Sequence, residues 1–239
     1  NNTLAYFQAQ QRAVTKEDYI TRVYALPAKY GNVAKAYIVQ DTQLDSQSGA
    51  NSDGRIINPL ALNLYVLGFN ATKKLAIVNQ AVKENIQTYL TQFRMVTDAV
   101  NIKNAFVINV GVNFSLLTKV GYNKEEVVLK AIQKVKDYFN IDKWQIGQPI
   151  VLADIAYQLS LVDGVSAVVP PEEDNPNGLP VLITNKFKVS GGYSGNIYNI
   201  NQATKDGIVY PSLDPSCFEL KFPNADIQGR VIGDSTGGN

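Results

Sequence analysis

The segment RAVTKEDYITRVYALPAKYGNVAKAYIV, Arg12 to Val39, carries the strongest pattern in this chain of 239 residues. Thr15 predicts a helix N-cap, and Asp18 stands where a carboxylate would accept from the cap backbone, as in a capping box. An apolar stripe follows on one helix face, and Pro27 and Gly31 are expected to end the helix. The closing apolar, β-branched run predicts a buried strand. The segment encodes shape, and it contains no residue constellation with obvious chemistry.

Hydrophobic periodicity predicts the elements that surround this segment. Strands are expected at Val33–Val39, Leu60–Phe69, Ala105–Leu117 and Val165–Val169. Helices are expected to begin at Thr72, after the N-cap Asn123 with Glu126 as its capping-box partner, and at Pro149. A polar loop is expected at Asp41–Asn58 and a turn at Thr97–Asn101. The order strand, helix, strand, helix, helix, strand predicts two successive β-α-β units.

The composition changes at Pro170, where the Pro- and acid-rich stretch PPEEDNPNGLP begins. Short strands are expected beyond it, at Val181–Val189, Gly195–Ile200, Phe218–Phe222 and Arg230–Ile232. The predicted fold class is therefore α+β: a ferredoxin-like split β-α-β core, with an N-terminal helix-strand unit and an irregular β-rich C-terminal part. The predicted domains are 1–58 for the helix-strand segment and polar loop, 59–170 for the core, and 171–239 for the C-terminal region.

Composition excludes several classes of function. The net charge of +1 and the absence of a basic stripe argue against a nucleic-acid binder, since phosphate contacts need an excess of cations. No apolar run approaches the roughly 20 residues of a membrane span, and no signal peptide opens the chain. The first residue is Asn1, so we expect a fragment or processed part of a longer protein. We predict no nucleic-acid and no membrane partner.

The chain has no histidine, which excludes Ser-His-Asp and Cys-His catalysis and zinc sites built on Cys and His. The only cysteine, Cys217, cannot form an internal disulfide and is expected to be a small buried side chain. We therefore predict that the protein is not an enzyme and holds no cofactor and no metal.

Carboxylates leave one catalytic alternative open. Asp41, Asp45 and Asp53 lie in a polar loop, but their spacing and the missing closing Glu do not fit a calcium loop. The cluster Glu172, Glu173 and Asp174 could serve a carboxylate-based hydrolase, although its Pro-rich context favours an exposed loop tip.

Two further segments have ordinary interpretations. Ser190–Gly195, SGGYSG, matches no phosphate-binding pattern and predicts a flexible turn. Lys130, Lys134 and Lys136, with Lys119 and Lys124 nearby, predict a solvated helix face, because no aromatic residues alternate with them for base stacking.

Tyrosine is unusually frequent, with 13 residues against a single tryptophan. Tyrosine has an apolar body and a polar tip and is enriched at protein interfaces. Ordinary strand packing is the alternative explanation for each one. The predicted interaction residues, in segments expected to be exposed, are Tyr6, Phe7, Tyr193, Tyr198 and Tyr210.

The opening segment resembles the baseplate J-like family of contractile-tail phages and related injection machines. The residues that carry the resemblance are Arg12-Ala13-Val14-Thr15, Asp18-Tyr19, Gly31, Val33, Ala34 and Ala36. The later strands and the long helix with Tyr89-Leu90 are also similar, so the resemblance covers about Gln10 to Val169. The polar insertion Ser46–Arg55 and the region after Pro170 depart from the family pattern.

The resemblance implies a structural protein of a baseplate wedge in the tail of the virion, assembled in the host cytoplasm. It implies a homodimer that also binds other wedge proteins, including a larger wedge subunit, and it supplies no catalytic residue. A receptor- or carbohydrate-binding module of a phage tail is the alternative, with exposed tyrosines and the loops near Asp45 and Gly192 as its contact sites.

Overall fold

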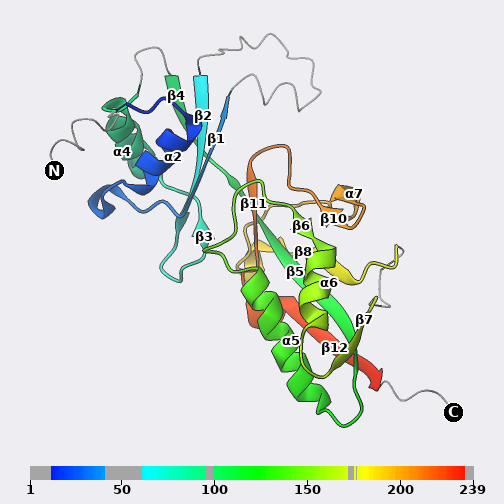
Figure 1. The fold of residues 1–239 in the computed structure, drawn as a ribbon. Helices are drawn as coiled ribbons and strands as arrows, with labels where there is room; N and C mark the ends of the chain where they lie inside the picture. The colour runs from blue at the N-terminus through cyan, green and yellow to red at the C-terminus, as the bar shows by residue number, and fades with distance from the viewer. Residues whose placement is uncertain (1–11, 41–60, 95–98, 172–174, 176, 235–239) are drawn as a thin grey trace, which may run out of the picture. The chain divides into compact units, whose positions relative to one another are not determined.

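The computed structural model describes residues 12–40, 61–94, 99–171, 175 and 177–234. They form two compact units (Figure 1). The first extends to Phe106 and includes Leu213–Pro215; the second contains Val107–Ser212 and the chain from Ser216 onward. Both units contain helices and strands, which confirms the predicted α+β class.

The capping box predicted in the opening segment is present. The Thr15 hydroxyl accepts from the Asp18 amide at 3.2 Å, and Asp18 Oδ2 accepts from the Thr15 amide at 2.9 Å. Helix α2, Lys16–Tyr24, follows directly, and the short 3-10 helix η1, Ala28–Tyr30, comes after Pro27. These hydrogen bonds satisfy backbone donors that the first helical turn leaves open.

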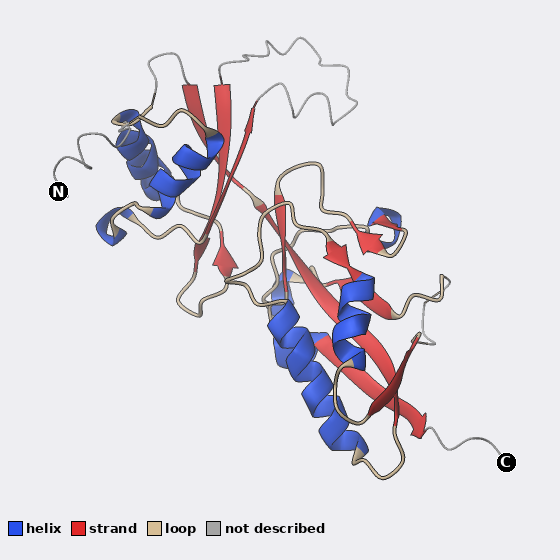
Figure 2. Cartoon of the chain, in the orientation of Figure 1, coloured by secondary structure: helices blue, strands red, loops and turns tan. Residues whose placement is uncertain are grey.

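The first unit is a sheet with helices on one face. Strand β2, Ala61–Phe69, is central: β1, Lys35–Gln40, pairs with it antiparallel, and β4, Ala99–Asn104, pairs with it in parallel. The short β3, Leu75–Ala76, pairs with the end of β2. Helices α2 and α4, Gln80–Thr91, pack against each other and against β1 and β4 respectively. Figure 2 shows both helices beside these strands.

The core of this unit lies between the helices and one face of the sheet. Tyr19 of α2 and Ile86 of α4 pack with Leu64 of β2, and all three are fully buried or nearly so. Gly31 makes the chain reversal before β1 possible. Its φ is +129°, and a Cβ there would lie 2.5 Å from Val82 of α4, so the position requires glycine both for backbone and for space.

Two predicted boundaries in this unit were wrong. The long helix begins at Gln80 after the N-cap Asn79, whose side chain accepts from the Val82 amide at 2.9 Å. Thr72 instead lies in a turn, where Asn70 Oδ1 accepts from the Thr72 and Lys74 amides. Residues 99–101, predicted as a turn, begin β4. The strand parallel to β2 is therefore β4, and the expected Ala105–Leu117 strand belongs to the second unit.

Strand β5, Phe106–Thr118, organises the second unit. It pairs antiparallel with β8, Val181–Asn185, along its middle and with β7, Val165–Val169, at its end. It pairs in parallel with β12, Ile227–Asp234, and also pairs with β11, Ser216–Glu219. Because β2 and β5 lie in different sheets, the two successive β-α-β units do not form the single ferredoxin-like sandwich that we predicted.

Helices α5, Lys124–Tyr138, and α6, Leu152–Ser160, pack against each other and cover one face of this sheet. Beside α5, the ring of the only tryptophan, Trp144, stacks on Phe139 at 5.2 Å between ring centroids. Pro149 does not begin a helix: residues 150–151 form β6, Ile150–Val151, which pairs with β10, Ile208–Val209. Strand β10 also pairs with β9, Thr204–Lys205.

The region after Pro170 contributes strands to the same sheet. Strand β7 before this residue and β8 after it both pair with β5. The predicted strand Arg230–Ile232 lies within β12, whereas the predicted strand Gly195–Ile200 is irregular up to α7, Ile200–Ala203. The 3-10 helix η2, Val189–Gly191, and helix α8, Pro223–Asp226, complete the unit. The predicted domain border at 58/59 lies outside the described residues.

Candidate interaction surface

An irregular loop of the second unit, residues 186–198, is fixed to β5 by buried side chains. Asn109 of β5 is completely buried, and its Oδ1 accepts from the Ser194 amide at 2.8 Å. Its Nδ2 donates to Glu219 Oε2 of β11 at 2.8 Å. Its carbonyl accepts from the Lys186 amide at 2.8 Å. One amide residue thus connects β5, β11 and two points of the loop.

The same loop has two further attachments to the sheet. The Val107 carbonyl of β5 accepts from Ser194 Oγ at 2.7 Å and from Asn196 Nδ2 at 2.8 Å. Asn185 Oδ1, at the end of β8, accepts from the Tyr198 amide at 2.9 Å. These hydrogen bonds replace a strand ladder, so the loop has a defined path although its only regular element is the short η2.

Tyr193 ties the loop to α8. Its hydroxyl donates to Asp226 Oδ1 at 2.5 Å, and Asp226 Oδ2 accepts from the Phe222 amide at 2.8 Å. The Tyr193 and Phe222 rings meet edge to face at 5.3 Å. Burial, together with the hydrogen bond to the carboxylate, raises the pKa of Tyr193 to about 12.

The structure places the predicted interaction residues differently from one another. Tyr6 and Phe7 lie outside the described residues. Tyr193 and Tyr198 are partly buried, and the Tyr198 hydroxyl donates to the Tyr210 carbonyl at 2.7 Å. The Tyr210 side chain is exposed. The two tyrosines of the loop thus hold it in place, and the role of all five residues in binding stays a prediction.

The loop also exposes aliphatic side chains that the sequence analysis did not single out. Val189 is 72% exposed and Ile197 is 78% exposed, and Phe222 of the adjoining segment is exposed as well. Their sequence signal is weak, since single apolar residues among Gly, Ser and Asn are common in loops. Only the buried attachments described above show that these side chains stand on a fixed backbone.

Helices α5 and α6 also carry exposed apolar side chains. Leu129 of α5 is 67% exposed, and Tyr157 of α6 and Leu161 at its end are exposed as well.

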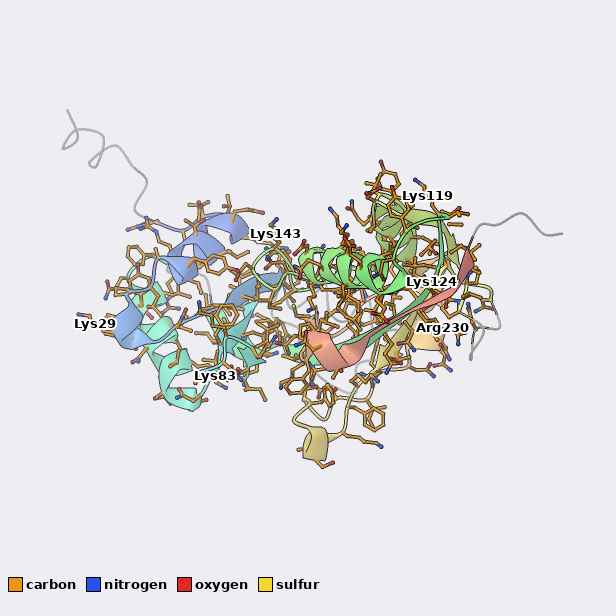
Figure 3. The ribbon with its side chains drawn as sticks, turned by 90° about the horizontal axis from the view of Figure 1, so that it is seen from below. Lys29, Lys83, Lys119, Lys124, Lys143 and Arg230 are labelled. Atoms are coloured by element: carbon orange, nitrogen blue, oxygen red, sulfur yellow. The ribbon has the colours of Figure 1, made fainter. Side chains whose placement is uncertain are left out.

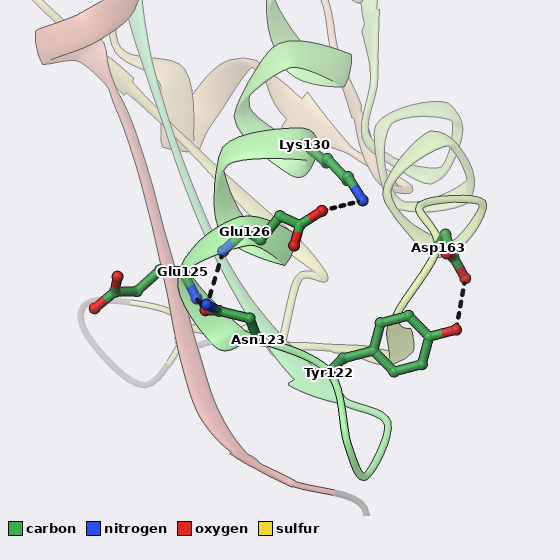
Figure 4. Close-up of polar contacts among 6 residues, drawn as sticks. All are labelled: Tyr122, Asn123, Glu125, Glu126, Lys130 and Asp163. Carbon is green, nitrogen blue, oxygen red and sulfur yellow. Dashed lines mark hydrogen bonds and ion pairs between the residues drawn. The ribbon is translucent and has the colours of Figure 1, made fainter.

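Polar contacts surround the beginning of α5 (Figure 4). Asn123 caps the helix as predicted by accepting from the Glu125 and Glu126 amides.

The predicted partner of that cap makes a different contact. The Glu126 carboxylate lies 2.6 Å from Lys130 Nζ, and this pair raises the pKa of Lys130. Nearby, the Tyr122 hydroxyl donates to Asp163 Oδ1 at 3.0 Å, which raises the pKa of Tyr122. Both contacts are exposed; the first lies within α5, and the second connects the turn before α5 to the turn after α6.

The described part of the chain holds few groups suited to chemistry. No group of three or more His, Cys, Asp or Glu side chains there could hold a metal ion. The carboxylates Glu172, Glu173 and Asp174, and those of the 41–58 loop, lie outside the described residues. Cys217 is buried, as predicted. No helix among the described residues is long and apolar enough to cross a bilayer.

One cavity of about 220 Å³ lies on the sheet of the second unit. Its polar lining comes from Asn113, Ser115, Gln228 and Arg230, and Arg230 Nε donates to Ser115 Oγ at 3.2 Å. Figure 3 shows Arg230 on β12. Lys119 directly follows β5, Lys124 is the first residue of α5, and Lys143 lies in the segment after α5. These labelled cations of the second unit therefore come from separate elements.

No family model matches the chain, and no curated protein matches it. Solved structures do match. One is a chain of the cryo-EM structure of the anti-feeding prophage (AFP) baseplate, 6-fold symmetrised, with a TM-score of 0.55 and 12% sequence identity. The match covers 89% of this chain and 39% of that chain. At this identity the likeness shows a shared fold, and this chain corresponds to less than half of the baseplate chain.

Proposed function

We propose that this chain is a structural component of the baseplate of a contractile tail. The observation that supports the proposal is the likeness of fold to a baseplate chain over 89% of the residues. Neither compact unit alone could supply that coverage, so the likeness includes both. The opening segment, with its capping box and Gly31, independently resembles the baseplate J-like family.

Within this role we propose a non-enzymatic wedge protein of the virion tail, similar to the C-terminal part of the T-even phage wedge protein that forms the inner, iris-like ring. The chain would pair with a second copy and with a larger wedge subunit, and it would be made late and assembled in the host cytoplasm. A stable pairing typically buries about 800 Å² on each partner, which is within reach of a chain of this size.

Two measurements test these statements separately. Mass spectrometry of purified tail particles should find this chain in the baseplate, and its absence would refute the structural role. Size-exclusion chromatography with light scattering tests self-pairing: we expect a dimer at high micromolar concentration, and a strict monomer would argue against it.

A receptor- or carbohydrate-binding module is the second candidate. The observation that favours it is the cavity on the second unit, whose amide, hydroxyl and guanidinium groups are suited to hydroxyl-rich ligands. A glycan array with the purified protein distinguishes the two functions. The assembly function predicts no binding to any glycan, and binding that Arg230→Ala abolishes would favour the alternative.

A further inference from the structure

We propose that part of the second unit is a docking surface for another protein chain that presents an apolar centre with acidic residues around it. We call it the lysine-apolar surface. Its members are Lys186, Lys188, Val189, Ile197, Lys221 and Phe222. The inference rests on the proposed function, because a baseplate component must contact neighbouring subunits, and it adds the place and the chemistry of one such contact.

The loop and the segment beside it expose apolar side chains. Val189 and Ile197 each leave more than two thirds of their surface in solvent. A Cβ added at Gly195 would lie 3.0 Å from Val189, and one added at Gly192 would lie 3.2 Å from the Phe222 ring. The loop backbone therefore lies close to the Val189 and Phe222 side chains, and Ile197 belongs to the same loop. Clustered exposed apolar groups of this kind mark interaction sites.

The backbone that carries these side chains is fixed by hydrogen bonds. Asn109, Asn185 and Asp226 hold the loop through hydrogen bonds of 2.5 to 2.9 Å. Anchor side chains on a preorganised backbone lose little conformational entropy on binding, which favours their use as interface anchors. A freely moving loop would not offer this advantage.

Charge is distributed unevenly between the surface and the interior of this region. The segments 186–197 and 219–226 contain three lysines and two carboxylates. Both carboxylates point inward: Glu219 is 2% exposed and receives the Asn109 amide, and Asp226 is 1% exposed and receives the Tyr193 hydroxyl. The two segments thus leave lysines and apolar side chains accessible without an accessible carboxylate, and a complementary partner carries acidic residues beside apolar ones. Rigid aliphatic anchors favour a protein partner over nucleic acid, which rewards stacking aromatics instead.

The test uses purified tail particles and a carbodiimide, which joins a lysine to a carboxylate in direct contact. We expect mass spectrometry to find Lys188 or Lys221 joined to Asp or Glu of a different polypeptide. If the chain is absent from the particles, the proposed function and this inference fail together. If the chain is present but Lys188 and Lys221 stay unjoined and react freely with an acetylating reagent, the proposed function stands and this inference fails.

A pair of variants gives an independent readout. Val189→Asp/Ile197→Asp should reduce incorporation into particles by about tenfold or more, because it places negative charge against an acidic partner. Val120→Asp, at a 62% exposed position in the turn between β5 and α5, is the control and should incorporate normally. Thermal unfolding of both purified variants should equal that of the parent. Equal incorporation of the two variants would overturn the inference.

Vesicles of phosphatidylserine and phosphatidylcholine test the rival partner, an anionic membrane. We expect no cosedimentation of the protein with these vesicles. Cosedimentation that Val189→Asp/Ile197→Asp abolishes would overturn the assignment to a protein partner.

Discussion

Asn109 donates a hydrogen bond of 2.8 Å to Glu219, although the two residues are 110 positions apart in the chain and both are buried. The contact connects β5 to β11, and the same amide accepts from the loop at Ser194. Asn109 therefore stabilises both the pairing of distant strands and the path of the exposed loop.

Replacing this side chain tests its contribution. Asn109→Ala removes the donor to a buried carboxylate and the acceptor of the Ser194 amide, so we expect a loss of about 2 to 3 kcal/mol in the free energy of unfolding. Urea denaturation, followed by the fluorescence of Trp144 in the second unit, measures it. Asn201→Ala, on the exposed α7, is the matched control and should change the free energy by less than about 0.5 kcal/mol.

The contact between Tyr193 and Asp226 predicts a delayed alkaline titration. The pKa of Tyr193 is raised from 10.0 to about 12, so the neutral hydroxyl is favoured in the folded state. Its stabilising contribution is fully present below pH 10 and is lost as pH rises through about 12. Spectrophotometric titration of tyrosinate should show that Tyr193→Phe removes one late-titrating group. An unchanged alkaline end of the titration curve would contradict the contact.

Gly31 and Gly121 form a matched pair for separating backbone strain from crowding. Both have positive φ, at +129° and +87°. A Cβ at Gly31 would lie 2.5 Å from Val82, whereas a Cβ at Gly121 would enter open space. Gly121→Ala should lower the free energy of unfolding by about 1 kcal/mol, because alanine is strained at this positive φ. Gly31→Ala should lower the free energy of unfolding by about 2 to 4 kcal/mol, because overpacking against Val82 adds to the backbone strain. Urea denaturation of both variants measures the difference.

Removing the obstacle should rescue part of that loss. Gly31→Ala combined with Val82→Ala should unfold with a smaller penalty than the sum of the two single substitutions, measured as a double-mutant cycle. Strict additivity would show that Val82 does not limit the space at Gly31.

The capping box at the start of α2 predicts an acid dependence of local stability. Backbone hydrogen bonds from Thr15, and then from Val14, hold the pKa of Asp18 below its ordinary value of 3.8. The contribution is fully present above that value and is lost as pH falls through the lowered pKa. The protection of α2 amides from hydrogen exchange, taken relative to the intrinsic exchange rate at each pH, should fall in acid for the parent chain but show no such dependence in Asp18→Asn. Glu17→Gln, in the same helical turn, should retain it.

Thr15→Ala should weaken the same helix start by about 1 kcal/mol, because it removes the side-chain acceptor of the Asp18 amide. Faster hydrogen exchange confined to α2 is the expected result. Unchanged exchange would show that packing of Tyr19 and Val23 alone maintains the helix.

Local signals in the sequence predicted much of the fold. Thr15, Asp18 and Asn123 mark helix starts through side-chain hydrogen bonds to neighbouring backbone, so the sequence contains the whole interaction. The α+β class followed from periodicities of the same local kind. The predicted helix start at Thr72 was wrong, because threonine is a common N-cap residue but here its hydroxyl donates to Asn70 within a turn. Asn79 caps the helix instead.

Long-range pairing could not be predicted in this way. Apolar and polar residues alternate over only a few positions in β4, which directly precedes β5 in the chain. Its parallel pairing with β2 is what identifies it as a strand of the other sheet. Burial of Glu219 and Asp226 depends on partners more than 30 positions away in the chain. Tyr193 and Tyr198 are predicted from the sequence to be exposed interaction residues, but in the structure each donates its hydroxyl to a hydrogen bond that fixes the loop. The most exposed anchors, Val189 and Ile197, have no sequence signature of their own.

The parallel pairing of β5 with β12 has a consequence for biosynthesis. Residues 106–118 leave the ribosome well before residues 227–234. One edge of β5 therefore stays unpaired until β12 has been synthesised. The first unit, whose strands are close together in sequence, can condense earlier. During that interval the unpaired edge of β5 is accessible to chaperones and to neighbouring nascent chains. The order of synthesis therefore bears on how such a subunit avoids aggregation.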